Sequence, residues 1–328
     1  MQPKKPIQGS VLDWSRPRTK AHAVKPSDSN LFADVLAIEA ETAKDAGMIG
    51  YMARQLLQAT LPHSAKPGNE FSRVNGNLRV SILAPAGVGL PYGSYPRLLL
   101  IWLTSETWRA RGQMLCLGDS LSGFMTELGL LPTGGRWGTI PRFYDQTNRL
   151  FQAHMTVCES MSTESERQSQ GNNVSIADAW CLRWSMEKAG GQRSLFGSWV
   201  KLSNSFFHLV TDRPVPIDLR VIRKLKKSPM ALDVYMWSTY RMSYLQRRTE
   251  IPWGSLQMQF GADYADTPEG CRNFRKKYVA ALRKVCAYYS ELRIAEGRRG
   301  LVLLPSPPHV PRASRSCNVV PASGDRLR

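Results

Sequence analysis

The clearest periodic pattern in the chain runs from Thr267 to Tyr289, where apolar and basic positions separate onto opposite faces of a helix. Thr267 is a favourable N-cap and Pro268 suits a first helical turn. The apolar face comprises Phe274, Tyr278, Ala281, Leu282, Val285, Tyr288 and Tyr289. The basic face and its flanks comprise Arg272, Arg275, Lys276, Lys277, Arg283 and Lys284. The pattern predicts a helix that packs on a core while it presents positive charge to an anion.

A short basic hairpin is predicted directly after this helix. Two apolar runs flank a glycine-containing turn that carries Arg298 and Arg299. The elements expected in this region are a helix capped by Ser228, an extended piece, a second helix, the basic helix, and the two strands of the hairpin. Their expected bounds are Pro229–Arg248, Glu250–Pro252, Gly254–Phe260, Thr267–Tyr289, Leu292–Ile294 and Leu301–Leu304. This order is typical of a winged helix, a variant of the helix-turn-helix.

The same order of elements is predicted once before. It comprises Pro96–Arg111, Met114–Leu117, Ser120–Leu128, a turn at Gly129–Gly138 with Arg136, Ile140–Ala153 and His154–Cys158. The polar face of the helix Ile140–Ala153 carries Arg142, Gln146, Asn148, Arg149 and Gln152. Arginine and amide side chains match guanine and adenine edges in the major groove. Asp145 on that face would repel phosphate, and an ordinary solvated helix face is the alternative interpretation.

These patterns predict an α+β chain, mainly helical, with two tandem winged-helix domains and disordered basic tails. The expected divisions are a basic arm at 1–30, an N-terminal domain at 31–213, a C-terminal domain at 214–304 and a proline-containing mobile tail at 305–328. Asp218 is a good N-cap just after the boundary. Other expectations are a helix at Leu31–Gly47, strands at Leu56–Leu61 and Val80–Leu83 with a turn at Asn75–Asn77 between them, and an exposed loop at Glu164–Asn173.

Positive charge is concentrated at the C-terminal side of the chain. The net charge is +18, from 44 basic and 26 acidic residues. Residues 219–300 hold 17 basic and 7 acidic residues, whereas residues 31–218 hold 17 and 16. This asymmetry is the electrostatic footprint of a nucleic-acid binder, with a merely soluble basic protein as the alternative.

Several other classes of protein are disfavoured. The chain has no apolar run long enough to cross a membrane and no apolar segment of a secretory signal near its start. Its six cysteines form no C-x-x-C pair and its five histidines are isolated, so we expect no metal site, no disulfide framework and no cofactor. A P-loop is absent, and Tyr278 falls on the apolar face, where a core role is expected rather than that of a nucleophile. We therefore expect no enzymatic activity.

Several runs resemble the plasmid-encoded RepA replication initiators. The runs are Gly50–Arg54, Gln58–His63, Gly89–Ser94, Leu117–Ser122, Pro132–Gly138, Pro214–Leu219 and Leu232–Tyr235. The resemblance extends from about Leu31 to Leu304. It implies a bacterial cytoplasmic protein that binds repeated duplex sites (iterons) in a plasmid origin, promotes opening, and recruits the host initiator and helicase. It also implies possible repression of its own gene and a possible homodimer through the N-terminal domain.

Two other functions are compatible with these sequence patterns. A winged-helix transcription regulator without a role in initiation would need the same duplex-reading helices. A partner-binding adaptor would instead use the basic helix as a protein interface, with weak DNA affinity that does not depend on sequence.

Overall fold

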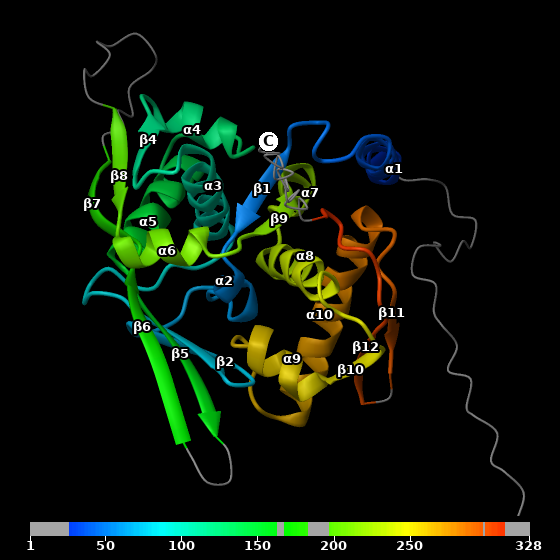
Figure 1. Ribbon diagram of the computed structural model, residues 1–328. Helices are drawn as coiled ribbons and strands as arrows, with labels where there is room; N and C mark the ends of the chain where they lie inside the picture. Colours follow the sequence, from blue (N-terminus) through cyan, green and yellow to red (C-terminus); the bar gives the residue numbers. More distant parts are fainter. Residues whose placement is uncertain (1–25, 163–166, 183–196, 298, 312–328) are drawn as a thin grey trace, which may run out of the picture.

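Two units of the same connectivity form the body of the molecule. The computed structural model describes residues 26–162, 167–182, 197–297 and 299–311 (Figure 1). The first unit comprises α3 (Ser94–Ala110), β4 (Met114–Gly118), α4 (Leu121–Glu127), α5 (Thr139–Gln152), β7 (Ala177–Cys181) and β8 (Ser198–Leu202). The second unit comprises α8 (Pro229–Met242), β10 (Thr249–Pro252), α9 (Trp253–Phe260), α10 (Pro268–Tyr288), β11 (Ile294–Glu296) and β12 (Gly300–Leu303).

Each unit builds its sheet in the same spatial order. The strands run β4-β8-β7 in the first unit and β10-β12-β11 in the second, with every pair antiparallel. In both cases the third strand of the unit lies between the other two. The two units are thus equivalent in element order and in strand order. The strand predicted at His154–Cys158 to complete the first unit belongs instead to a separate sheet, and β7 and β8 take its place.

The first unit carries a long insertion between α5 and β7. The inserted hairpin of β5 (His154–Ser162) and β6 (Arg167–Ser175) joins β2 (Glu70–Asn75) and β3 (Leu78–Leu83) in an antiparallel sheet of order β2-β3-β5-β6. The far end of this hairpin extends away from the body (Figure 1). The predicted turn at Asn75–Asn77 is present, and Gly76 adopts the positive φ of +58° that such a turn requires.

A small strand pair and four further helices connect these parts. β1 (Ile49–Met52) pairs antiparallel with β9 (Val215–Asp218), which is far away in sequence. The helices are α1 (Pro26–Glu39), α2 (Arg54–Gln58), α6 (Asn204–Thr211) and α7 (Leu219–Leu225). Asp218 caps α7 as predicted, because its carboxylate accepts a hydrogen bond from the Arg220 amide at 2.8 Å.

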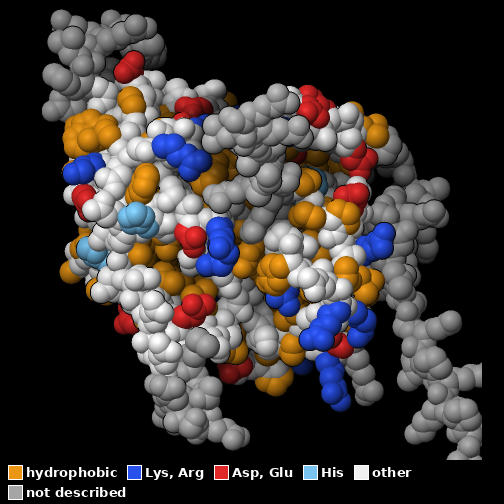
Figure 2. All heavy atoms as spheres, in the orientation of Figure 1, with side chains coloured by type: hydrophobic (Ala, Val, Ile, Leu, Met, Phe, Trp, Pro, Cys, Tyr) orange, Lys and Arg blue, Asp and Glu red, His pale blue; other side chains and the backbone are white. Residues whose placement is uncertain are grey.

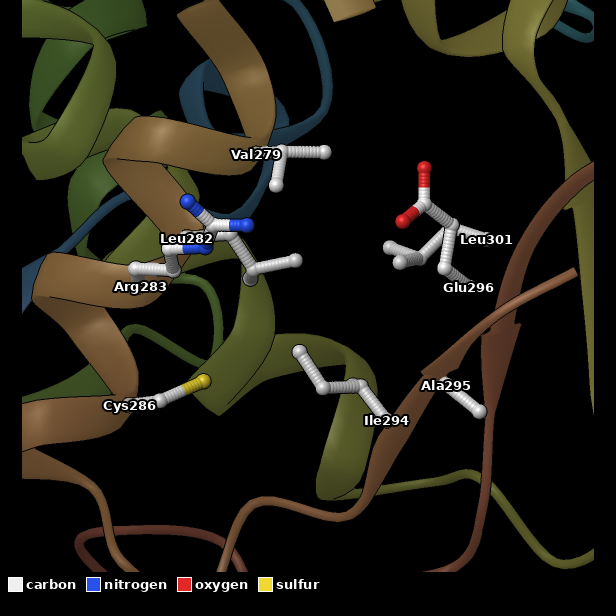
Figure 3. A pocket seen from close by; sticks show the side chains of 8 residues that line it. All are labelled: Val279, Leu282, Arg283, Cys286, Ile294, Ala295, Glu296 and Leu301. Carbon is white, nitrogen blue, oxygen red and sulfur yellow. The ribbon is translucent and has the colours of Figure 1, made fainter. Parts of the chain in front are cut away.

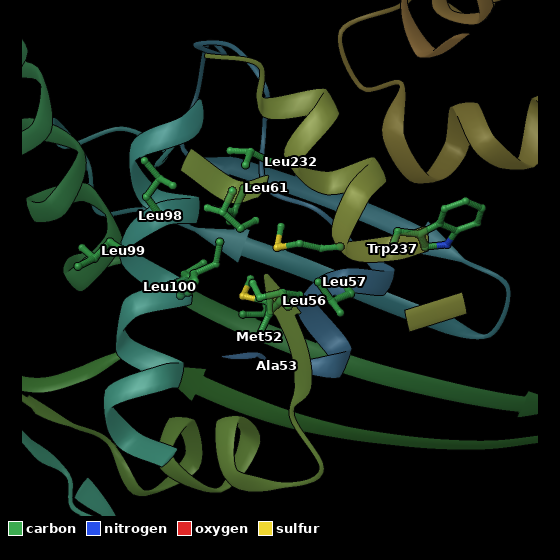
Figure 4. Packing of buried hydrophobic residues seen from close by; sticks show 14 of the residues in the cluster. Met52, Ala53, Leu56, Leu57, Leu61, Leu98, Leu99, Leu100, Leu232 and Trp237 are labelled. Carbon is green, nitrogen blue, oxygen red and sulfur yellow. The ribbon is translucent and has the colours of Figure 1, made fainter. Parts of the chain in front are cut away.

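One hydrophobic core runs through both units. Figure 4 shows Met52 and the leucines of α2 between Leu99 of α3 and Trp237 of α8, and all of these side chains belong to one cluster of buried residues. Helix α2 also contacts α8 directly. The boundary expected at Pro214 therefore lies within a continuous core, and the division into domains stays a prediction.

One expected strand and one expected loop are wrong. Residues 54–58 form helix α2, in which the adjacent Leu56 and Leu57 are both buried, an arrangement that a strand with one covered face cannot provide. The segment expected as a loop at Glu164–Asn173 instead pairs with β5 from Arg167 onward, while residues 163–166 lie outside the described part. Its residues 168–173 are exposed, so ladder hydrogen bonds rather than burial maintain this strand.

Three expected element ends also differ. Helix α1 ends at Glu39 instead of Gly47, and α8 ends at Met242 instead of Arg248, where the Ser243 hydroxyl donates to the Tyr240 carbonyl at 2.7 Å. Residues 305–311, expected within a mobile tail, lie against the core: Val310 is buried and the His309 Nδ1 atom is 2.8 Å from the Tyr235 hydroxyl. Residues 1–25 and 312–328 lie outside the described part.

Candidate nucleic-acid interface

Helix α10 forms where its sequence predicts, with most of its apolar face buried. The Thr267 side chain accepts a hydrogen bond from the Gly270 amide at 3.1 Å, which satisfies one donor of the first turn. Phe274 and Tyr278 are completely buried. Burial raises the pKa of the Tyr278 phenol well above its ordinary value. This hydroxyl is therefore a neutral core group, as expected, and is not available as a nucleophile.

The opposite side of α10 is a stripe of exposed cations. Arg272, Lys276 and Arg283 fall within about 40° of one another on the helix, and Lys277 and Lys284 flank them. All five are exposed. Within the described residues, Arg272, Lys276, Lys277 and Lys284 have no carboxylate partner in an ion pair. We call the five exposed residues Arg272, Lys276, Lys277, Arg283 and Lys284 the α10 stripe.

Arg275 has a different position from the stripe. Its guanidinium forms an ion pair with Glu296 at the end of β11, with Nε 2.9 Å from Oε1, and lies 5.1 Å from the centre of the Trp253 ring. It thus joins α10, the hairpin β11–β12 and the start of α9. This ion pair links the hairpin to the helix, and the Glu296 carboxylate offsets the positive charge of Arg275.

The hairpin turn adds exposed positive charge. Arg299 is exposed, and its carbonyl accepts a hydrogen bond from the Trp253 amide at 3.3 Å. Arg298 lies outside the described residues. In Figure 2, Lys and Arg side chains gather over the region of β10 and β12 at the lower right.

A small pocket lies between α10 and the hairpin (Figure 3). It is lined by Val279, Leu282, Arg283, Cys286, Ile294, Ala295, Glu296 and Leu301. Burial raises the pKa of the Cys286 thiol to about 12, so the thiol stays protonated. The pocket therefore offers apolar surface and no reactive group.

Helix α5 of the first unit does not present the predicted polar face in full. Gln146 is buried, and its side-chain oxygen accepts a hydrogen bond from the Tyr92 amide at 2.7 Å. Its expected role in reading bases is therefore wrong: the segment that precedes α3 occupies this amide. Arg149 is also engaged, by Asp145 at 2.8 Å and by the Leu90 carbonyl at 3.4 Å.

Cationic groups remain exposed at the start of α5. Arg136 and Arg142 are exposed, and the Arg142 Nε donates to the Gly138 carbonyl at 3.1 Å. Asn148 is half-buried and its amide donates to the Tyr144 carbonyl at 3.2 Å. The first unit thus presents its charge at the tip of α5, whereas the second unit presents a stripe along the whole of α10.

The sequence analysis missed a buried ion pair that joins the two units. Arg97 of α3 and Asp233 of α8 are 1 % and 4 % exposed. The His63 Nε2 atom lies 2.8 Å from the same carboxylate. Burial alone would raise the pKa of Asp233, but the charge of Arg97 and the hydrogen bonds to it lower that pKa overall. Burial also lowers the pKa of His63, which favours the neutral ring.

Neither a metal site nor a membrane-crossing helix is found in the part of the chain that the structure describes. No group of three or more His, Cys, Asp or Glu side chains lies close enough to hold an ion there. Asp263, one of the acidic residues near the turn before α10, is bound by Ser64 and by Lys66. No described helix is both long and apolar enough to cross a bilayer.

The structure is that of a mixed α/β protein whose second unit carries exposed cations along α10. The sequence model of the plasmid-encoded RepA protein family matches residues 90–253. The chain belongs to this family of plasmid replication initiators, as its sequence resemblance indicates. No curated protein gave a significant match to the chain.

Two solved structures are similar in fold. A crystal structure of domains 2 and 3 of RctB, as a selenomethionine derivative, has 12 % identity and a TM-score of 0.48, and covers 79 % of this chain and 97 % of that one. A second RctB structure of domains 2–3 has 12 % identity and a TM-score of 0.44, with 75 % and 93 % covered.

Proposed function

We propose that this protein initiates plasmid replication by binding iterons, repeated duplex sites in its origin, with α10 as the principal reading helix. The α10 stripe is the observation that carries the proposal, because among the described residues Arg272, Lys276, Lys277 and Lys284 have no carboxylate partner in an ion pair. Phosphate groups supply the missing negative charge, and their neutralisation releases counterions from DNA.

We assign each unit to the winged-helix fold. In this assignment α8, β10, α9 and α10 correspond to the helices and first strand, and the hairpin β11–β12 is the wing. The equal strand order of the two units supports the assignment. Under it, α10 is the recognition helix and enters the major groove, while the wing carrying Arg298 and Arg299 contacts the backbone.

The cations of the α10 stripe fall into two groups by their position around the helix. Arg272, Lys276 and Arg283 form the central line of the stripe and are the candidates for base edges. Lys277 and Lys284 flank that line and are suited to phosphates. Arg275 also lies on the DNA side, but through Glu296 it acts mainly on the placement of the wing.

The rest of the proposal follows from family membership. Several copies bound to adjacent repeats would strain the duplex and favour its opening nearby, after which host initiator and helicase are recruited. Binding at a promoter that overlaps such repeats would repress the gene for the protein. A homodimer through the N-terminal domain, at residues 31–213, belongs to the same proposal.

A titration of the full chain against duplex DNA tests the proposal. The purified protein is titrated with its own plasmid's repeats and with a scrambled duplex, at several salt concentrations. Arg272→Gln and Lys276→Gln each remove one charge from the stripe, and Lys44→Gln makes the same change at an exposed lysine in the nearly neutral part of the chain.

The expected result is a strong preference for the repeats. Each stripe variant should flatten the log–log salt dependence by about one unit, whereas Lys44→Gln should leave it unchanged. Equal binding to both duplexes would overturn iteron recognition. Binding to the repeats without opening of the origin in the presence of host proteins would instead favour a transcription regulator.

A further inference from the structure

The loop before α5 displays an aromatic side chain that the duplex-binding proposal does not use. Among the described residues, Trp137 has the largest exposed fraction of the large hydrophobic side chains, 82 %, and Leu131 in the same loop is 75 % exposed. Trp137 and Leu131 thus place two exposed apolar side chains in one loop, and Trp137 contributes a large flat ring to which a ligand can bind.

The loop that carries Trp137 is closed by its own hydrogen bonds. The Thr133 amide donates to the Thr139 hydroxyl at 2.8 Å, and the Thr139 amide donates to the Thr133 hydroxyl at 2.9 Å. The Thr139 hydroxyl in turn donates to the Leu131 carbonyl at 2.7 Å. The indole is therefore presented from a constrained backbone, so a ligand need not order this loop when it binds.

The surroundings of the indole are cationic. The Arg136 guanidinium lies 5.3 Å from the centre of the Trp137 ring, and Arg142 is exposed one turn further along. The sequence from Leu128 to Tyr144 contains no acidic residue. Asp145, which follows it, is paired with Arg149. The loop thus joins a flat aromatic surface to unbalanced positive charge, a combination suited to an anionic ligand that carries aromatic rings.

The geometry of α5 favours an unpaired nucleic-acid strand over a duplex. Gln146 is withdrawn into the core and the charge of Arg149 is neutralised, so the middle of the helix has little with which to read a major groove. The bases of an intact duplex are stacked on each other and leave no ring face for an indole. An unpaired strand exposes both base faces and phosphates together.

We propose that Trp137 stacks on an unpaired base of single-stranded DNA while Arg136 and Arg142 bind its phosphates. The inference rests on the proposed function, since opening of the origin supplies such a strand. The two units then have different tasks: the second reads the closed duplex through the α10 stripe, and the first retains a strand once it has separated.

Two binding measurements on the full chain test this assignment. The first uses a fluorescently labelled twelve-nucleotide oligothymidylate, and the second uses the duplex repeats, both followed by anisotropy at the same salt concentration. The variants are Trp137→Ala, which removes the ring, Trp137→Phe, which retains an aromatic surface, and Leu131→Ala, which removes exposed apolar surface from the same loop. Thermal unfolding of each variant shows that the fold is retained.

Loss of the indole should weaken binding of the single strand about fivefold or more, and leave duplex affinity within about twofold. Trp137→Phe should retain most of the binding, and Leu131→Ala nearly all of it. Unchanged oligothymidylate binding in Trp137→Ala would overturn the inference. The exposed loop would then be a candidate binding surface for a protein partner instead. An equal loss on both DNAs would overturn it too. Since the duplex titration uses α10 variants, iteron binding and strand binding can fail separately.

Discussion

Arg97 and Asp233 form a buried bidentate ion pair that joins α3 of the first unit to α8 of the second. The Arg97 Nε and Nη2 atoms lie 2.8 and 2.7 Å from the two carboxylate oxygens. The remaining donors of the guanidinium bind the carbonyls of Leu61, Pro62 and Gly93. Every donor is thus satisfied, which is the condition under which a charge can be buried at all.

Removal of one member of this pair should be strongly destabilising. Asp233→Ala leaves the Arg97 charge buried without its partner, and we expect a loss of about 3–5 kcal/mol in the free energy of unfolding by urea. Lys224→Met, which breaks the exposed pair of Lys224 with Asp34, should cost about 1 kcal/mol or less. Similar losses in the two variants would mean that the buried pair contributes no more than a surface pair.

The Arg275–Glu296 pair predicts a gain in DNA affinity. Glu296 ends strand β11 of the hairpin, forms an ion pair with Arg275 of α10, and lines the pocket between the two elements. Glu296→Gln removes a negative charge that repels phosphate and frees Arg275 for DNA. We expect tighter binding of the repeats, by a few-fold, and a steeper salt dependence. Weaker binding would show instead that placement of the wing by this ion pair matters more than the charge of Glu296.

Gly300 in β12 and Gly254 in α9 give a matched test of how closely the backbone is packed at each position. A Cβ at Gly300 would lie 2.0 Å from the Ile251 carbonyl oxygen, within the pairing of β10 with β12. Gly300→Ala should therefore cost about 1–3 kcal/mol and weaken DNA binding as the wing shifts. A Cβ at Gly254 in α9 meets nothing within 4 Å, so Gly254→Ala should be neutral or stabilising by up to about 1 kcal/mol. Equal thermal stability of the two variants would contradict this difference.

Stability should fall as the pH drops below about 6.5 because of His309. Burial lowers the pKa of this ring below its ordinary value of 6.5, so the unfolded chain binds the proton more readily than the folded one. The free energy of unfolding therefore increases as the pH rises toward 6.5, and it decreases as the pH falls below that value. His309→Phe should reduce the pH dependence of urea unfolding between pH 7 and 5. His63, whose pKa is also lowered, should supply the dependence that remains.

Local chemistry made much of the fold predictable. Helices α4, α7, α8 and α10 begin after side chains that accept hydrogen bonds from the first turn, and such caps can be recognised in the sequence. The apolar face of α10 was predictable for the same reason, because a period of 3.6 residues is a local property. Strand β6 was not predictable, since its run of exposed polar residues has no apolar alternation and its strand pairing depends on β5.

Local sequence patterns likewise predict only part of the candidate site. The stripe on α10 follows from helical spacing, but the withdrawal of Gln146 depends on the Tyr92 amide, more than fifty residues earlier in the chain. The pairing of Arg97 with Asp233 is equally remote. A signal did exist, because each charge stands beside apolar residues in a helix, at Leu98 and Leu232, and a charge in such a place requires a partner. The identity of that partner is set by the tertiary fold.

The pairing of β1 with β9 has a consequence for synthesis of the chain. β1 emerges early from the ribosome, but its only strand partner among the described residues is β9, after the whole of the first unit. Contacts this distant in sequence form slowly and leave an open strand edge in the meantime. During translation β1 therefore remains without its strand partner until β9 has been made, and interruption of synthesis before Asp218 would leave an aggregation-prone fragment.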